Sequence, residues 1–223
     1  MIVVGYDLPS SRAAVELAEE HPGLWAAVGV HPHEAATVER DALGCLRGLA
    51  KRDRVVAVGE TGLDFYRDLS PRPTQMAAFR EHLELAGEMD LPVIVHCREA
   101  QEALLEVLSA HGDLKLVWHC FDGSREQAER ALGLGMTLGF GGMLTYKRAE
   151  ELRAVIAEAP LDRVLLETDC PYLAPEPKRG RDNEPANLPI IAECAAKASG
   201  RSRGQIEEVT AENARRVFGL DDG

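Results

Sequence analysis

The sequence lacks the features that define several classes of protein. No apolar run approaches the roughly 18 residues of a membrane span, and the first residues carry no basic segment followed by a signal-type apolar stretch. The five cysteines, at positions 45, 97, 120, 170 and 194, show no CxxC spacing, which argues against a zinc ribbon and a disulfide framework. We therefore expect a cytoplasmic protein in a reducing compartment, with no membrane partner.

An excess of basic residues is also missing. Against 37 acidic side chains stand 25 basic ones, which leaves a net charge of -12. A generic polyanion-binding surface needs a basic footprint, so this balance argues against one. Any substrate that carries phosphate must then be met by local positive charge or by metal ions.

No linker, internal repeat or low-complexity tract interrupts the 223 residues. A length of this order fits one hydrophobic core, and α/β barrels often reach it undivided. With 45% hydrophobic residues the chain can bury such a core. We therefore expect a single domain over residues 1–223.

Short β-branched runs alternate with segments of helical period, which indicates βαβ units around a parallel sheet. We expect seven strands and seven main helices, the last with Ser202 and Gln205 as a capping box. The strands are expected at 2–6, 24–30, 54–60, 91–96, 114–119, 136–140 and 163–168, and the helices at 10–21, 73–90, 99–111, 124–135, 149–159, 188–199 and 202–218. Seven units leave two α/β folds open, because a (β/α)8 barrel needs eight units and doubly wound sheets carry five to seven strands.

Ionisable residues stand at the ends of five of these strands: His31, Glu60, His96, His119 and Asp169. In a parallel barrel all carboxyl ends meet at one rim, so these side chains would converge although they are far apart in sequence. Each residue alone could be a hydrogen-bonded structural group or a helix cap. Together, after runs too apolar to tolerate a stray charge cheaply, they indicate a divalent-metal site.

Cysteines 97, 120 and 170 each follow one of these residues directly, so a thiolate zinc site is an alternative. Successive side chains of a strand point to opposite faces. If His96 and His119 face the metal, Cys97 and Cys120 should face away from it. We therefore expect these cysteines to act as small buried apolar side chains.

Five motifs occur in a fixed order: GVHPHEA, VGETGLDFY, VIVHCREA, WHCFDGS and LLETDCPYLAPEP. In this order and spacing they resemble the TatD-type metal-dependent hydrolases and deoxyribonucleases over essentially the whole chain. The resemblance implies a TIM (β/α)8-type barrel of the amidohydrolase superfamily. It also implies a one- or two-metal centre and phosphodiester hydrolysis of DNA, often as an exonuclease.

The resemblance assigns roles to the residues of these motifs. Glu60 matches the carboxylate that bridges both metals, His96 and His119 match ligands of the second metal, and Asp169 matches the carboxylate of the first. Arg98 would share the face of His96 and hold a substrate phosphate, or form only a salt bridge at the rim. Those ligands suit Mg, Mn or Zn, and the sequence does not choose among them.

The first motif of such proteins is not found. Members open with a strand that ends in a His-x-His pair, whereas MIVVGYD aligns with their second strand. We therefore expect that seven βα units are present and that the first unit of the eight in a (β/α)8 barrel is missing. We also expect that the chain binds one cation well and a second weakly, and that its activity is reduced. His31 of HPHEA is then expected to face the substrate, with replacement of the absent ligand pair as its alternative role.

These observations favour a metal-dependent deoxyribonuclease with DNA, or alternatively RNA, as its substrate. Cations would neutralise charge on the attacking and leaving oxygens, Asp169 would accept the proton of the attacking water, and Glu60 would hold the metals. The alternatives are an amidohydrolase or deacylase acting on a small substrate, and a truncated metal-binding protein with reduced activity. Lys178, Arg179 and Arg181, in the loop 172–187, favour a phosphate-bearing substrate over a neutral one.

Overall fold

The computed structural model describes residues 1–38 and 40–220, and the chain divides into two compact units within that part. The first unit comprises Met1–Val117 with the described residues from Val217 on, and the second comprises Trp118–Arg216. Residues 39 and 221–223 of the predicted domain lie outside the described residues. The expectation of a single barrel domain over the whole chain stays a prediction.

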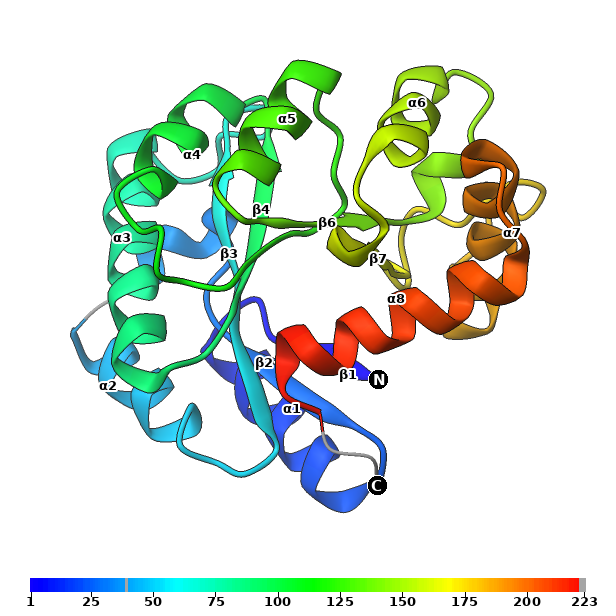
Figure 1. The fold of residues 1–223 in the computed structure, drawn as a ribbon. Helices are drawn as coiled ribbons and strands as arrows, with labels where there is room; N and C mark the ends of the chain where they lie inside the picture. Colours follow the sequence, from blue (N-terminus) through cyan, green and yellow to red (C-terminus); the bar gives the residue numbers. More distant parts are fainter. Residues whose placement is uncertain (39, 221–223) are drawn as a thin grey trace. The chain divides into compact units, whose positions relative to one another are not determined.

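Strands and helices alternate through the first unit (Figure 1). Its elements are β1 (Ile2–Val4), α1 (Leu8–Glu20), β2 (Trp25–Val28), the 3-10 helix η1 (Pro32–Thr37), α2 (Arg40–Leu49), β3 (Val55–Asp64), α3 (Arg72–Met89), β4 (Val93–Arg98) and α4 (Gln101–Leu108). Strand β5 (Leu116–Trp118) contains the division between the units. Helix α2 was not expected from the sequence, since Gly44 and Gly48 weaken its helical pattern.

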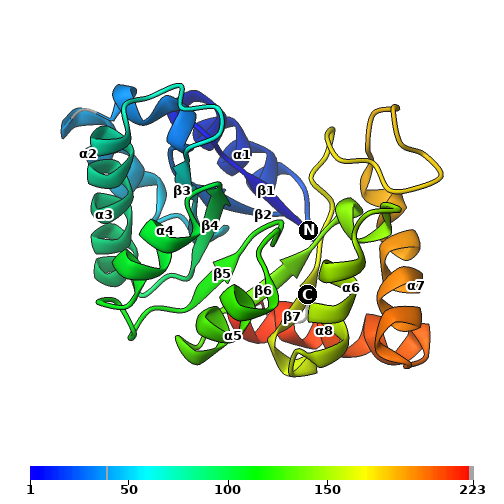
Figure 2. The same ribbon diagram turned by 90° about the horizontal axis from the view of Figure 1, so that it is seen from above.

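The first unit carries a parallel sheet in which β1, β2, β3 and β4 pair in sequence order. Helix α1 packs against β1 and β2, and α3 packs against β3 (Figure 2). A doubly wound sheet would place its first strand between later ones, so the sequential order favours the barrel type. Its core contains Ala26, Val28, Phe79, Leu83 and Leu104, all with 1% exposure or less.

The second unit continues the same alternation of elements. Its elements are α5 (Arg125–Gly133), β6 (Thr137–Phe140), η2 (Gly142–Thr145), α6 (Glu150–Glu158), η3 (Leu161–Arg163), β7 (Val164–Leu166), η4 (Pro185–Asn187), α7 (Leu188–Ser199) and α8 (Arg203–Phe218), the last two residues of α8 being grouped with the first unit. Strands β6 and β7 pair in parallel. The rings of Trp118, Phe121 and Phe140 form an aromatic cluster, with centroids 4.9 and 6.0 Å apart along the series.

Helix α8 begins as the sequence predicts. The backbone N–H of Gln205 donates to the Ser202 hydroxyl at 3.2 Å, and the Ser202 N–H donates to Gln205 Oε1 at 3.1 Å. Near its other end, the side-chain amide of Asn213 donates to the carbonyls of Leu161 and Val164 at 2.8 and 2.9 Å. These contacts hold the helix against the segment that leads into β7.

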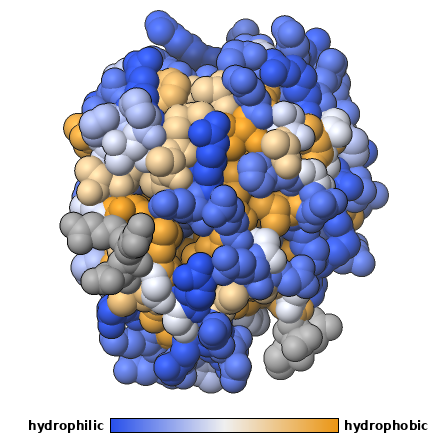
Figure 3. Space-filling model, turned by 90° about the vertical axis from the view of Figure 1, so that its left-hand side faces the viewer, coloured by the Kyte–Doolittle hydropathy of each residue, from blue (hydrophilic) through white to orange (hydrophobic). Residues whose placement is uncertain are grey.

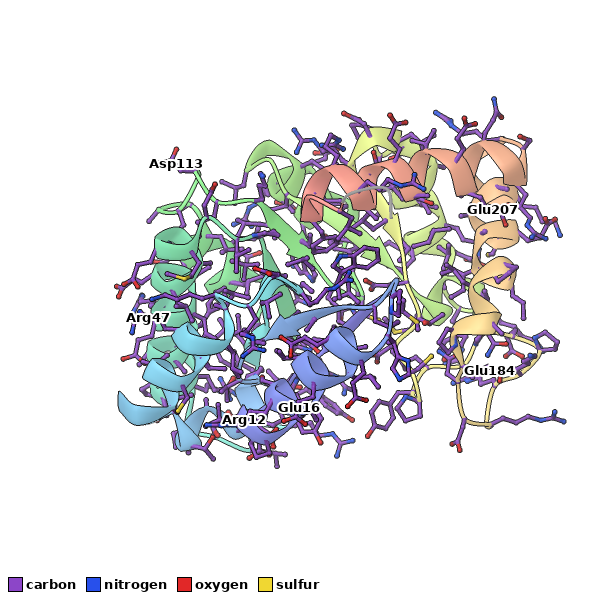
Figure 4. The ribbon with its side chains drawn as sticks, turned by 90° about the horizontal axis from the view of Figure 1, so that it is seen from below. Arg12, Glu16, Arg47, Asp113, Glu184 and Glu207 are labelled. Carbon is purple, nitrogen blue, oxygen red and sulfur yellow. The ribbon has the colours of Figure 1, made fainter. Side chains whose placement is uncertain are left out.

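Charged side chains lie on the outer surface, on helices and on the segments that connect them. Polar residues cover most of the face drawn in Figure 3, and apolar residues show between them, as on most protein surfaces. Charged residues that point outward are labelled in Figure 4: Arg12, Glu16, Arg47, Asp113, Glu184 and Glu207. In α1 the opposite face is buried, with Ala14, Val15 and Ala18 directed inward. No helix among the described residues is long and apolar enough to cross a membrane, and the cytoplasmic location stays a prediction.

His82 of α3 is a fully buried histidine that supports β2. Its Nε2 accepts the backbone N–H of Val30 at 3.0 Å, and its Nδ1 donates to the Ala78 carbonyl at 2.7 Å. This pattern requires the neutral ring, and burial lowers the pKa of His82 below the ordinary value of 6.5. The ring thus holds the chain immediately before His31.

Acidification is therefore expected to destabilise the protein through His82. The unfolded chain takes up the proton at higher pH than the folded one, so the stability due to the neutral ring is complete above pH 6.5 and falls as the pH drops below it, by at most about 1.4 kcal/mol per pH unit. Denaturant unfolding of wild type and His82→Gln at pH 8 and pH 5 measures the difference that this ring makes. The difference in free energy of unfolding between wild type and His82→Gln should be smaller at pH 5 than at pH 8. An equal difference at both pH values would contradict the assignment of a neutral His82. His21→Gln, which replaces an exposed histidine, is the matched control.

Candidate metal centre

Strand β3 is longer than the sequence analysis predicted. It was expected to end at Glu60, but it continues to Asp64, because Thr61–Asp64 pair in register with Val95–Arg98 of β4. A register shift between Val58 and Thr61 marks a bulge at Glu60. Glu60 therefore lies inside β3 and not at its end, and the expectation on that point was wrong.

Three residues of the first unit form what we call the Glu60 site: His31, Glu60 and His96. One side-chain nitrogen or oxygen from each lies within 4.8 Å of those of the others. His96 Nδ1 is 2.8 Å from Glu60 Oε1, and His31 Nε2 is 3.9 Å from the same oxygen. Two imidazoles and a carboxylate are ligands for divalent transition metals, so the donor set fits such an ion.

His31 follows β2 and precedes η1. Its Nδ1 accepts the backbone N–H of His33 at 3.2 Å, which leaves Nε2 on the side of Glu60. From its sequence motif His31 is expected to face the substrate, with metal ligation as its alternative role. Its position in the Glu60 site agrees with that alternative, and neither role is tested by the geometry. Burial, with the nearby charge of His96, lowers the pKa of His31 to about 3.

His96 stands between two carboxylates of β3. Its Nδ1 contacts Glu60, and its Nε2 is 3.2 Å from Asp64 Oδ2. Burial alone would lower the pKa of His96, but the hydrogen bonds with Asp64 and Glu60 outweigh it and raise the pKa to about 9. Cys97, the next residue of β4, is 5% exposed on the other face of the strand, as alternation predicts.

Asp64 is a residue of this region that the sequence analysis missed. It is 1% exposed, and its Oδ2 also lies 2.8 Å from His33 Nε2. Burial would raise the pKa of Asp64, but hydrogen bonds from His96, the Arg67 N–H and His33 hold it well below its usual range. Its place four residues after Glu60, in a motif that had been singled out, was the signal available in the sequence.

A second group, here called the Asp169 site, lies in the second unit and comprises His119, Cys120 and Asp169. Their ligand atoms are also within 4.8 Å of one another. His119 Nε2 is 3.4 Å from Asp169 Oδ1, and His119 Nδ1 is 3.0 Å from Glu167 Oε2. Glu167 is the other carboxylate that the sequence analysis missed, although its spacing of two residues from Asp169 would place both on one side of an extended chain.

Cys120 does not follow the alternation that was expected to turn it away from His119. Strand β5 ends at Trp118, and Cys120 has a positive φ of 50°, so the rule for successive strand residues does not apply. Its thiol is therefore within reach of His119 and Asp169. No disulfide involves any of the five cysteines, all of which are described.

Arg98 closes β4, two residues after His96 and in register with Asp64. Its side chain is exposed, and its guanidinium carbon lies 3.9 Å from the centre of the Tyr66 ring. Cation–π contact of this kind restrains the side chain without removing its charge. The contact is a stacking arrangement, and both expected roles of Arg98, phosphate binding and a rim salt bridge, stay predictions.

The loop that carries Lys178, Arg179 and Arg181 has no strand and reaches α7 through η4. Within it, Lys178 Nζ is 3.3 Å from Glu184, and the Arg179 guanidinium lies 4.4 Å from the centre of the Tyr146 ring. Asn183 ties the loop back by donating to the Tyr172 carbonyl at 2.8 Å. Local contacts thus hold the side chains of Lys178 and Arg179.

Imidazole and carboxylate groups in or just after the strands of an alternating β/α chain are typical of metal-dependent hydrolases built on a TIM-type barrel. Comparison with known proteins gives the family. The family model of the TatD related DNases matches residues 1–219. The chain therefore belongs to the TatD family of metal-dependent hydrolases.

Individual relatives agree with this assignment. The uncharacterized metal-dependent hydrolase YabD of Bacillus subtilis is 39% identical over 223 residues, which span 99% of this chain and 88% of that protein. The 3'-5' ssDNA/RNA exonuclease TatD of Erwinia tasmaniensis is 41% identical over 228 residues, with the same shares of 99% and 88%. The crystal structure of YjjV, a TatD homologue of Escherichia coli, superposes with a TM-score of 0.93 at 33% identity, covering 99% of this chain and 86% of that one. The barrel fold and the hydrolase class predicted from the sequence are thereby confirmed.

Proposed function

We propose that this hydrolase is an exonuclease that cleaves phosphodiester bonds of single-stranded DNA or RNA with one or two divalent cations. The observation that carries the proposal is the Glu60 site, where His31, Glu60 and His96 present their ligand atoms within 4.8 Å of one another beside the exposed Arg98. The name of the Erwinia relative, a 3'-5' ssDNA/RNA exonuclease, supports the substrate class. Mg, Mn and Zn are the candidate ions.

Both units contribute candidate cation ligands: Glu60, His96 and His31 in the first, and His119 and Asp169 in the second. Bound cations supply charge neutralisation for the phosphodiester and lower the pKa of a water molecule. The cations would thereby offset the electrostatic repulsion between a nucleic acid and a chain of net charge -12.

Two residues act directly on the reactants in this proposal. Asp169, whose side chain is 31% exposed, accepts the proton of the attacking water. Arg98 binds a phosphate oxygen of the substrate, and its stacking on Tyr66 keeps the guanidinium beside β4. Arginine suits this task because its planar fork donates two hydrogen bonds to one phosphate.

End-labelled single-stranded DNA, incubated with the protein and Mg²⁺ or Mn²⁺, tests the function. We expect stepwise shortening that EDTA abolishes and added cation restores. A Glu60→Gln sample, purified in parallel, must lack the activity, since cleavage that survives this change does not come from the Glu60 site. Hydrolysis of small amide or ester substrates together with intact DNA would instead support the amidohydrolase alternative.

A further inference from the structure

Asp64 has all its hydrogen-bonding capacity engaged without belonging to the Glu60 site. Its Oδ1 accepts the backbone N–H groups of Tyr66 and Arg67 at 3.0 and 2.7 Å. Its Oδ2 contacts His33 Nε2 at 2.8 Å and His96 Nε2 at 3.2 Å. A carboxylate offers about four lone-pair directions, so this one is saturated by protein groups.

The backbone of Asp64 is held as firmly as its side chain. The buried side chain of Gln75 accepts the Asp64 N–H at 2.9 Å and donates to the Asp64 carbonyl at 3.1 Å. The same amide of Gln75 donates to the Ser70 carbonyl at 2.8 Å. Oδ2 thus stands at a fixed point opposite His96, on the side of the ring away from Glu60.

A carboxylate oxygen at that point selects one form of the imidazole. An ionised carboxylate only accepts hydrogen bonds, so His96 Nε2 must carry a proton toward Asp64. Glu60 accepts a proton in the same way from Nδ1, 2.8 Å from its Oε1, so the ring is protonated on both nitrogens in this arrangement. A cation held by Glu60 would replace the Nδ1 proton, and because Asp64 keeps the proton on Nε2, the lone pair would then be on Nδ1. Histidines that bind metals in proteins are commonly oriented through their second nitrogen in this way.

We propose that Asp64 is a positioning residue that fixes His96 in the tautomer with its proton on Nε2, so that Nδ1 is free to bind a cation in the Glu60 site. The inference rests on the metal centre in the proposed function, and it adds a residue that determines how tightly the cation is held. His33, the other partner of Oδ2, contacts Asp64 through Nε2 and is not assigned to the cation.

Asp64→Asn is the informative substitution because it keeps the shape of the side chain and replaces one acceptor oxygen by a donor NH2 group. The backbone N–H groups of Tyr66 and Arg67 require the amide oxygen on their side, so the amide nitrogen must face His96. That nitrogen donates, which favours a His96 ring with its proton on Nδ1 and no lone pair toward Glu60. Zn²⁺ affinity at the Glu60 site is expected to fall by about 10–100-fold, the usual cost of losing such a partner.

The Zn²⁺ titration should be followed through the ¹⁵N resonances of His96, which report the Glu60 site alone. Asp68→Asn is the matched control, since it removes the same charge four residues further on, at an exposed side chain that pairs with Arg72 at 3.3 Å. We expect the control to bind Zn²⁺ within about 2-fold of wild type. Equal affinity in Asp64→Asn and wild type would overturn the proposal.

The wild-type protein provides a measurement that does not depend on the variant folding. With Zn²⁺ bound, His96 should show a metal-bound Nδ1 and a protonated Nε2. A proton on Nδ1, or no Zn²⁺ bound by His96, would refute the inference even if Asp64→Asn were insoluble. Failure of the nuclease proposal can be distinguished from failure of this inference. In that case the chain would bind Zn²⁺ through the predicted tautomer and leave nucleic acid intact.

Discussion

Glu60→Gln is expected to remove both cation binding at the Glu60 site and hydrolysis. The carboxylate is the only anionic member of that site, and its Oε1 lies near both His96 and His31. An amide keeps the volume but brings no charge, so two imidazoles alone would have to hold the ion. Affinity should fall by more than about 100-fold, because even partners behind the ligands typically cost 10–100-fold when they are lost.

The measurement is Mn²⁺ or Zn²⁺ binding by calorimetry together with the cleavage rate at saturating cation. Glu88→Gln is the matched control: it makes the same chemical change in the same unit, on an exposed residue that pairs with Arg47 at 2.8 Å. The control should match wild type in both measurements. Full activity in Glu60→Gln would show that this site does not perform the reaction.

Gly62→Ala is expected to give the largest loss of stability. Gly62 has a φ of 144°, which L residues rarely adopt, and an added Cβ would lie 2.0 Å from the backbone oxygen of His96. The obstacle is main chain and not the end of a flexible side chain, so β3 and β4 would have to separate. Strain and overpacking of this kind cost roughly 3–5 kcal/mol, or about 6–20 °C in Tm for a chain of this size.

Thermal unfolding followed by circular dichroism checks this, with Gly44→Ala as the opposite case. Gly44 lies in α2, its φ is not in the positive range, and an added Cβ would meet nothing within 4 Å. Alanine there should stabilise by roughly 0.5–1 kcal/mol, the usual helical preference over glycine. A Gly62→Ala protein that melts with the wild type would contradict the close approach of β3 and β4.

Local patterns in the sequence were sufficient for the strands and most helices. Each strand is a short apolar run between polar segments, and all seven predicted runs overlap a strand of the structure. The end of β3 was misplaced, because TGLD reads as a turn when the pairing of Thr61–Asp64 with β4 is not known. Helix α2 was missed for a similar reason, since packing and not propensity stabilises it.

The candidate ligands were found because imidazole and carboxylate groups after apolar runs are conspicuous. Asp64 and Glu167 were not found although they share motifs with Glu60 and Asp169, because their contacts with the ring nitrogens of His96 and His119 are decided by side-chain geometry. The position of Cys120 was misjudged because β5 ends two residues before it.

The placement of Glu60 and Asp64 on a single strand limits how this segment can evolve. From Thr61 to Asp64 each residue of β3 has a fixed neighbour in β4, and side chains alternate between the two faces. One inserted or deleted residue between Gly62 and Asp64 would turn the Asp64 carboxylate to the opposite face, out of reach of His96. The spacing from Glu60 to Asp64 therefore tolerates no change in length.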